Sequence, residues 1–291
     1  MTCGVAQHGA VGIAYEVEGP QDGTPLLLIM GLGLPMLFWP AGFRRLLVER
    51  GFRVARFDNR DVGRSTHLTG PGLASPRVLL SRRAGYGLPE MAGDAAAVLD
   101  DLGWSSAHVA GVSLGGMIAQ MLAGLHPDRV RTLTSLSSTP SPHVGRPRPR
   151  ALPALFAGKA RNRDQAAEHM VRIFRIIGSP GYPLEEDFIR DAAARSFDLA
   201  HDPAGVRRQL AAVVLAADRR PVLRRLHLPA LVLHGDADPL IRLSGGLATA
   251  RAIAGAKLVV FPRMGHDLPT ALQPVIADEI AAVAGRWSPT R

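Results

Sequence analysis

A short apolar strand passes directly into a helix at a turn built from a serine and two glycines. Residues 111–115 read Gly-Val-Ser-Leu-Gly, between an apolar run over 107–110 and a helix expected over 116–123. The chain must bend sharply at Ser113, and glycines on either side leave room where a Cβ would collide with neighbouring elements. The pattern predicts that the Ser113 hydroxyl projects from the carboxyl end of a sheet, with the N–H of Leu114 beside it.

Two later segments end in residues that can activate a serine. Residues 229–238 form an apolar run that ends in Gly-Asp-Ala-Asp, and residues 261–267 end in Met-Gly-His-Asp. A serine hydroxyl is a poor nucleophile at neutral pH, so it needs a histidine base, which in turn needs an acid to fix its tautomer. The order along the chain, and the position of each residue after a strand, predict a catalytic triad of Ser113, Asp238 and His266.

Asp236 is a second candidate for the acid. Asp238 is favoured because it precedes Pro239 and lies further into the loop, from which it can turn back toward His266. Asp236 would then hydrogen-bond within the turn. Asp267 directly follows the histidine, and we expect it to point elsewhere in a structural role.

A glycine-rich turn, Gly31-Leu32-Gly33, follows the apolar strand expected over 25–30. An oxyanion hole needs two N–H donors, and we assign these to Leu32 and Leu114. The turn is no dinucleotide fingerprint, because the third glycine is missing and no acid follows the next strand in the right place. No cofactor and no metal are expected.

Apolar residues near these segments are candidates for contact with a substrate. They are Met36, Phe38, Trp39 and Met117, together with Phe156 or Phe174 from a later helical segment. For each of them, packing in the hydrophobic core is the alternative. The charged segment 58–65 could also bind substrate, but such residues more often pair and stiffen a loop beside a site.

Strands and helices alternate over most of the chain. Strands are expected over 12–19, 25–30, 53–57, 107–110, 130–135, 230–233 and 258–261, and helices over 40–50, 89–102, 116–123 and 271–284. Such alternation predicts a mostly parallel sheet flanked by helices. The segment 12–19 alternates apolar and polar residues, which is typical of a half-exposed edge strand.

The alternation breaks near Thr139, after which the chain is rich in proline and then reads as helices only. These helices are expected over about 165–177, 184–194 and 205–217. We therefore expect a core of residues 1–139 and 227–291, with residues 140–226 inserted as a helical cap. Because the acid and the histidine follow this insertion, the cap should close over the site.

Composition narrows the function classes. The 291 residues are 47% hydrophobic and 20% charged, which is ordinary for a globular enzyme, and the net charge is +9. Basic residues between 143 and 175 lack interleaved aromatic residues, so nucleic acid is not an expected partner, although an anionic substrate stays open. No stretch is long and apolar enough for a membrane span or has the pattern of a signal peptide, and the single Cys3 can form no internal disulfide. A cytoplasmic location is expected.

The chain resembles the α/β-hydrolase superfamily over nearly its whole length. It is most similar to the cap-bearing serine esterases related to aclacinomycin methylesterase. The residues that carry the resemblance are Leu28–Leu32, Trp39–Pro40, Phe57–Thr66, Gly111–Gly115, Gly235–Pro239 and Gly265–His266, with Met30 where many relatives have histidine. The resemblance implies the α/β-hydrolase fold, with an eight-stranded, mostly parallel sheet and an inserted helical cap, and a Ser-His-Asp esterase without a cofactor.

The expected function is hydrolysis of a carboxylic ester, including a methyl ester, of a small hydrophobic or polyketide-like substrate. A lyase, a C–C bond hydrolase or a perhydrolase of the same fold would use the same triad. A ligand receptor that keeps the triad but turns over slowly is the alternative from another class.

Overall fold

The computed structural model describes residues 2–73, 75, 78, 84–155 and 160–288. These residues form an eight-stranded sheet in the order β1-β2-β4-β3-β5-β6-β7-β8. The strands are β1 (Thr2–His8), β2 (Val11–Glu18), β3 (Thr24–Ile29), β4 (Phe52–Phe57), β5 (Ala107–Val112), β6 (Val130–Leu136), β7 (Ala230–Gly235) and β8 (Lys257–Phe261). β1 and β2 pair antiparallel, β2 pairs antiparallel with β4, and the remaining neighbours are parallel.

The expected fold class is therefore confirmed, but the prediction that residues 12–19 form an edge strand is wrong. β2 is no edge strand, because it pairs with β1 on one side and β4 on the other, and most of its residues are buried. The edge is β1, in which only Ala6 is buried. A strand with so few apolar residues gives little signal in the sequence.

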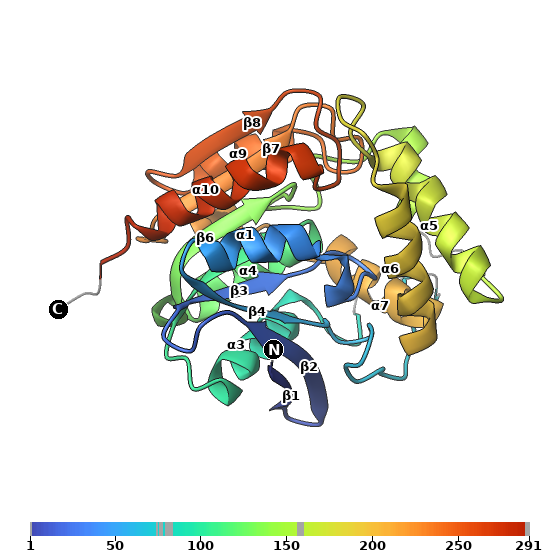
Figure 1. Ribbon diagram of the computed structural model, residues 1–291, viewed down its shortest axis with the longest axis horizontal. Coiled ribbons are helices and arrows are strands. Elements are labelled where there is room, and N and C mark those ends of the chain that lie inside the picture. Colours follow the sequence, from blue (N-terminus) through green and yellow to red (C-terminus); the bar gives the residue numbers. More distant parts are fainter. Residues whose placement is uncertain (1, 74, 76–77, 79–83, 156–159, 289–291) are drawn as a thin grey trace.

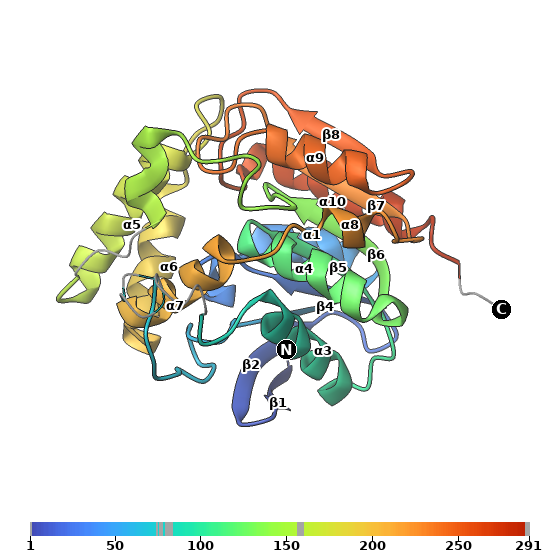
Figure 2. The same cartoon turned by 180° about the vertical axis from the view of Figure 1, so that it is seen from behind.

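Helices cover both faces of the sheet. One face carries α3 (Leu88–Asp101), α4 (Leu114–Leu125), the short α8 (Arg220–Leu223) and α9 (Ser244–Ala252), which lie in front of the strands in Figure 2. The other carries α1 (Ala41–Glu49) and α10 (Gln273–Ala284), in front in Figure 1. Strands buried on both faces read as nearly continuous apolar runs, as in the central strand β3.

Between β6 and β7 the described chain forms helices and loops. Here α5 (Arg163–Ile177), α6 (Glu186–Leu199) and α7 (Pro203–Val214) lie together at one end of the sheet (Figure 1). Leu223 of α8 packs in the core beside α4 and α9. Short 3₁₀ turns complete the structure, namely η1 (Met36–Phe38), η2 (Pro127–Arg129), η3 (Pro149–Leu155) and η4 (Thr270–Leu272).

No helix in the described ranges combines the length and the apolar character that crossing a membrane requires.

Candidate active site

The turn between β5 and α4 holds Ser113 in a strained conformation. Its φ of 57° and ψ of −119° are unusual for a residue with a side chain. A Cβ on Gly111 would overlap the carbonyl of Gly115, and a Cβ on Gly115 would overlap the carbonyl of Ile29. Ser113 N–H donates to Leu136 O over 2.9 Å, which ties the turn to the neighbouring strand. The two glycines therefore make possible the close packing that fixes the serine.

Ser113, His266 and Asp238 lie in hydrogen-bonding contact. His266 Nε2 is 3.0 Å from Ser113 Oγ, and His266 Nδ1 is 2.7 Å from Asp238 Oδ2. The other carboxylate oxygen of Asp238 accepts from the N–H groups of Leu240 and Ile241, each over 2.9 Å. Asp238 is 2% exposed. The acid is thus held on both oxygens and can orient the imidazole toward the serine.

Asp236, the alternative acid, lies elsewhere. Its carboxylate accepts from the backbone N–H of Arg263 over 2.6 Å, so it bonds at the surface to the loop after β8 and not within its own turn as expected. A further histidine, His234, is fully buried with Nε2 2.7 Å from Ile241 O and 3.7 Å from Asp238 Oδ2. Burial lowers the pKa of His234, which packs behind the acid.

The assigned oxyanion donors are the N–H groups of Leu32 and Leu114. Leu114 is the first residue of α4, so its N–H has no partner within the helix. Among the described residues neither N–H has a hydrogen-bond acceptor. A Cβ on Gly31 would lie 3.3 Å from Ser113 Cβ, which shows how closely the glycine-rich turn approaches the serine.

The charged segment 58–65 supports that turn. Asp58 accepts from the N–H of Met36 over 2.7 Å and from the N–H of Arg64 over 2.9 Å. Burial raises the pKa of Asp58, while these two hydrogen bonds oppose the rise. Asn59 Nδ2 donates to Met30 O over 3.0 Å. The segment therefore stiffens the chain on both sides of Leu32, although Asp61 also reaches the wall of the cavity.

Helix α7 is fastened to the same region by two adjacent residues that sequence reasoning missed. Arg208 pairs with both oxygens of Asp61, at 2.9 and 2.8 Å, and with Asp202 at 2.8 Å. Gln209 accepts from Gly33 N over 2.8 Å and donates to Arg60 O over 2.7 Å. In the sequence these two residues belong to three consecutive polar residues, Arg207–Gln209, a pattern that does not indicate a partner.

Asp61, His67 and Asp202 are also spaced closely enough to hold a metal ion, with one ligand atom from each within 4.8 Å of the others. However, the Arg208 guanidinium already bonds both carboxylates, and His67 Nδ1 lies 3.1 Å from Asp202. The cluster is therefore an ion-pair network.

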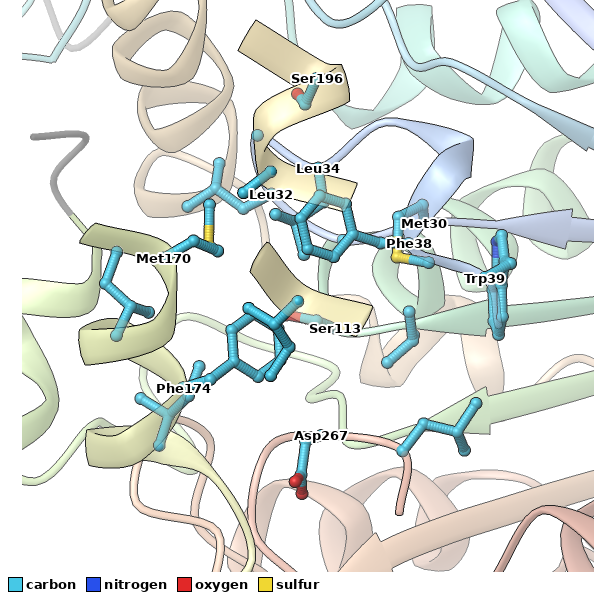
Figure 3. Close-up of a pocket in the computed structure, with 18 of the residues that line it drawn as sticks. Met30, Leu32, Leu34, Phe38, Trp39, Ser113, Met170, Phe174, Ser196 and Asp267 are labelled. Carbon is cyan, nitrogen blue, oxygen red and sulfur yellow. The ribbon is translucent and has the colours of Figure 1, made fainter. Parts of the chain in front are cut away.

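A cavity of about 490 Å³ opens above Ser113, between the sheet and helices α5 to α7. Figure 3 shows Ser113 among Met30, Phe38 and Phe174. The rings of Phe38 and Phe174 stack with centroids 6.2 Å apart and planes inclined by 6°. The other apolar residues of the wall include Leu32, Leu34, Trp39, Met170, Ile173, Ile177, Phe188, Ile189 and Val206. Many of them come from the amphipathic helices α5 and α6.

Of the expected contact residues, Phe38, Trp39 and Phe174 line the cavity. Met36 and Met117 do not, and the prediction that they contact substrate is wrong. Met117 points from α4 into the core beneath the sheet, and Met36 has no exposed surface. Phe156 lies outside the described residues.

The charge of the wall differs from that of the chain as a whole. Although the net charge is +9, no lysine or arginine is among the described residues that line the cavity. Four carboxylates do line it, those of Asp61, Glu185, Asp202 and Asp267. The Arg208 guanidinium balances two of them from behind.

Comparison with known proteins identifies the family. The profile of the family described as alpha/beta hydrolase fold matches residues 24–269. The chain belongs to this α/β-hydrolase fold family. Rhodomycin D methylesterase DnrP of Streptomyces peucetius is 30% identical, over 92% of this chain and 93% of that protein. The putative carbamate hydrolase RutD of Variovorax paradoxus is 37% identical, over 45% of each chain.

A solved structure shows the same α/β-hydrolase fold. The enol-lactonase of Burkholderia xenovorans LB400 superposes with a TM-score of 0.74 at 24% identity, covering 97% of this chain and all of that one. The resemblance to the methylesterase group that the sequence suggests is confirmed by these relatives.

Proposed function

We propose that this α/β-hydrolase cleaves carboxylic esters through an acyl-enzyme formed on Ser113. The chain is an ester-bond hydrolase by its family and its relatives, several of which are named esterases or methylesterases. The proposal rests on two consecutive hydrogen-bond contacts at the base of an apolar cavity: Asp238 Oδ2 to His266 Nδ1 at 2.7 Å, and His266 Nε2 to Ser113 Oγ at 3.0 Å.

The first half of the reaction forms the acyl-enzyme. Ser113 Oγ attacks the ester carbonyl carbon while its proton passes to His266 Nε2. The carbonyl oxygen becomes an oxyanion, which accepts hydrogen bonds from the N–H groups of Leu32 and Leu114. Asp238 stabilises the imidazolium. When the tetrahedral intermediate collapses, the bond to the alkoxy oxygen breaks and His266 returns the proton to the departing alcohol.

The second half releases the acid. Water takes the place of the alcohol and gives a proton to His266 Nε2 as its oxygen attacks the acyl carbon. The same two N–H groups bind the new oxyanion. Collapse breaks the bond to Ser113 Oγ, which regains the proton from His266, so the enzyme returns to its starting state.

The cavity favours a hydrophobic, uncharged acyl group. Its volume of about 490 Å³ and its aromatic wall suit a bulky, flat acid such as a polyketide-like ring system. The absence of lysine and arginine from the described wall argues against an anionic substrate. Two relatives that match more than nine-tenths of the chain are named rhodomycin D methylesterases, which supports a methyl ester as the bond that is cleaved.

Steady-state hydrolysis of two ester sets tests this proposal: p-nitrophenyl esters of increasing acyl length, and methyl esters of aromatic acids. The wild type should hydrolyse members of both sets, and Ser113→Ala should lose 10⁴-fold or more of kcat, in the range known for loss of a triad member. Ser105→Ala, a change at an exposed serine, is the control and should match the wild type.

Retention of most activity by Ser113→Ala would refute the site. If the wild type hydrolyses no ester yet a fluorophosphonate still labels Ser113, the triad is active but its substrate is not an ester, and the lyase and C–C hydrolase alternatives gain support.

A further inference from the structure

We propose that the α5–α6 loop of the helical segment, Ile177–Tyr182, positions the catalytic base, and that Ser179 is the residue through which it does so. This inference rests on the proposed function, because it gives His266 the role of general base. The segment that contains α5 to α7 would then not only enclose the substrate but also help to position the catalytic base.

The histidine loop has little support from its own strand. It runs from Pro262 to Pro269, between the exposed edge strand β8 and η4, and Arg263 within it has a φ of 58°. No described strand pairs with β8 on its outer side. A loop at the end of an edge strand must therefore be fixed by contacts with another part of the chain. The loop after β7 supplies part of them, because the N–H of Arg263 donates to Asp236 Oδ1 over 2.6 Å and the N–H of Ala237 donates to Met264 O over 3.1 Å.

The contacts to the backbone of the histidine itself come from the α5–α6 loop. The N–H of His266 donates to Ile177 O over 2.7 Å, and the N–H of Gly265 donates to Ser179 Oγ over 2.7 Å. Two consecutive backbone N–H groups at the catalytic histidine are thus bound by one short segment. A Cβ on Gly265 would overlap the backbone of Gly178, so the two loops are in direct backbone contact.

Ser179 also holds the residue on the other side of the histidine. Its hydroxyl donates to Asp267 Oδ1, and its N–H donates to Asp267 Oδ2 over 3.3 Å. Figure 3 shows the Asp267 carboxylate turned away from Ser113. The single Ser179 hydroxyl therefore accepts from residue 265 and donates to residue 267, and it brackets His266 between two hydrogen bonds.

The same two loops make three further contacts. The N–H of Gly181 donates to Arg263 O over 3.1 Å, Tyr182 Oη donates to Pro262 O over 3.2 Å, and Arg263 Nη2 donates to Pro180 O over 3.2 Å. These hold the loops together near the surface and are independent of Ser179. Removing the Ser179 hydroxyl should consequently loosen the histidine without detaching the loops.

The burial of Asp267 adds support. Burial raises the pKa of this carboxyl, and the hydrogen bonds from Ser179 oppose that rise. No lysine or arginine of the described chain forms an ion pair with it. Ser179 is therefore the main partner that satisfies this carboxylate.

The test compares Ser179→Ala with Ser179→Thr, which restores a hydroxyl. Three quantities are measured: kcat and KM for the best ester, the second-order rate of phosphonylation by a small fluorophosphonate, and the midpoint of thermal unfolding. Phosphonylation forms a bond from Ser113 Oγ to phosphorus and releases fluoride, and it depends on His266 but little on the rest of the cavity. We expect Ser179→Ala to lower kcat and the phosphonylation rate together, by about tenfold, with KM within twofold.

Ser179→Thr should recover most of both rates. Glu186→Gln is the matched control, because Glu186 joins α5 and α6 through Arg175 at 2.7 Å but forms no hydrogen bond or ion pair with the described residues of the histidine loop. It should leave both rates unchanged. If Ser179→Ala fails to fold, Asp267→Asn takes its place, since it weakens the same contact at the other partner and should lower both rates in the same proportion.

Unchanged phosphonylation in Ser179→Ala, or a change in KM alone, would overturn the inference. So would an equal loss in Glu186→Gln, since that would show a general effect of loosening the helices. Failure of the proposed function gives a different result: the wild type itself would then not be phosphonylated at Ser113.

Discussion

Replacement of Arg208 by methionine should remove a large part of the stability of this chain. The Arg208 side chain is 5% exposed, and the Asp61 carboxylate that it binds through two hydrogen bonds has no exposed surface. Removing one partner of a buried ion pair costs about 3–5 kcal/mol, because the other charge is left without compensation. Asp61 keeps donors in Tyr86 Oη and Leu68 N, each at 2.7 Å, so the lower value, about 3 kcal/mol, is expected.

The free energy of unfolding is measured by urea unfolding, and the midpoint temperature by thermal unfolding, each monitored by far-ultraviolet circular dichroism. A loss of about 3 kcal/mol should lower the thermal midpoint by about 6–12 °C in a domain of this order of size. The double variant Asp61→Asn with Arg208→Met removes both charges. Its loss of unfolding free energy should be about 2 kcal/mol smaller than the sum of the losses in the two single variants. Arg195→Met is the control, because its ion pair with Asp191 is exposed and should contribute less than about 1 kcal/mol.

A cost of less than about 1 kcal/mol for Arg208→Met, or additive effects of the two single changes, would contradict this prediction. Either result would mean that the Asp61 carboxylate is not held as a buried charge by α7.

Three further predictions concern the acid, the cavity wall and a buried histidine. Asp238→Asn should lower kcat by about 10⁴-fold, whereas Asp236→Asn, measured beside it, should change kcat by less than about threefold. Met117→Ala should cost about 2–5 kcal/mol in urea unfolding with little change in KM, whereas Phe174→Ala should raise KM for aromatic esters. Burial lowers the pKa of His108 from its ordinary value of 6.5 to about 4, so between these values the unfolded chain binds a proton that the folded chain does not. The free energy of unfolding should therefore fall by up to about 3 kcal/mol as the pH drops from 6.5 to 4. His108→Gln should lack this part of the fall. Urea unfolding of both proteins at several pH values measures the difference.

The central part of the fold could be predicted because its signals are local. An apolar strand, a glycine-flanked serine and a helix follow one another within a few residues, and the collisions of a Cβ at Gly111 and Gly115 explain why the pattern is so specific. The acidic and histidine loops each follow a strand in the same way. Their order along the chain predicts that Asp238 and His266 belong with Ser113.

Contacts between distant segments left no such signal. Ser179 and Asp267 are 88 positions apart, and Arg208 lies 147 positions from Asp61. Nothing in the composition of α7 or of the α5–α6 loop marks these residues as partners of the site. A single sequence therefore predicts which residues react but gives little indication of which residues hold them.

The wrong predictions have a similar cause. Apolar periodicity shows that Met36 and Met117 are buried, but a core and a cavity wall have the same apolar character. The sequence gives no signal for β1, because an exposed edge strand needs few apolar residues, and without β1 its partner β2 has the position of an edge strand. For the two methionines burial is predicted correctly and its geometry is not, whereas β2 is also more buried than its alternating pattern predicts.

Mass spectrometry of the inhibited enzyme shows whether Ser113 is the nucleophile of an ester hydrolase. The wild type is treated with a small fluorophosphonate until ester hydrolysis stops, then digested, and the modified peptide is sequenced. We expect one phosphonyl group per chain, on Ser113, with loss of hydrolysis in proportion to labelling. A label on another residue, or hydrolysis that persists when Ser113 is fully labelled, would contradict this expectation.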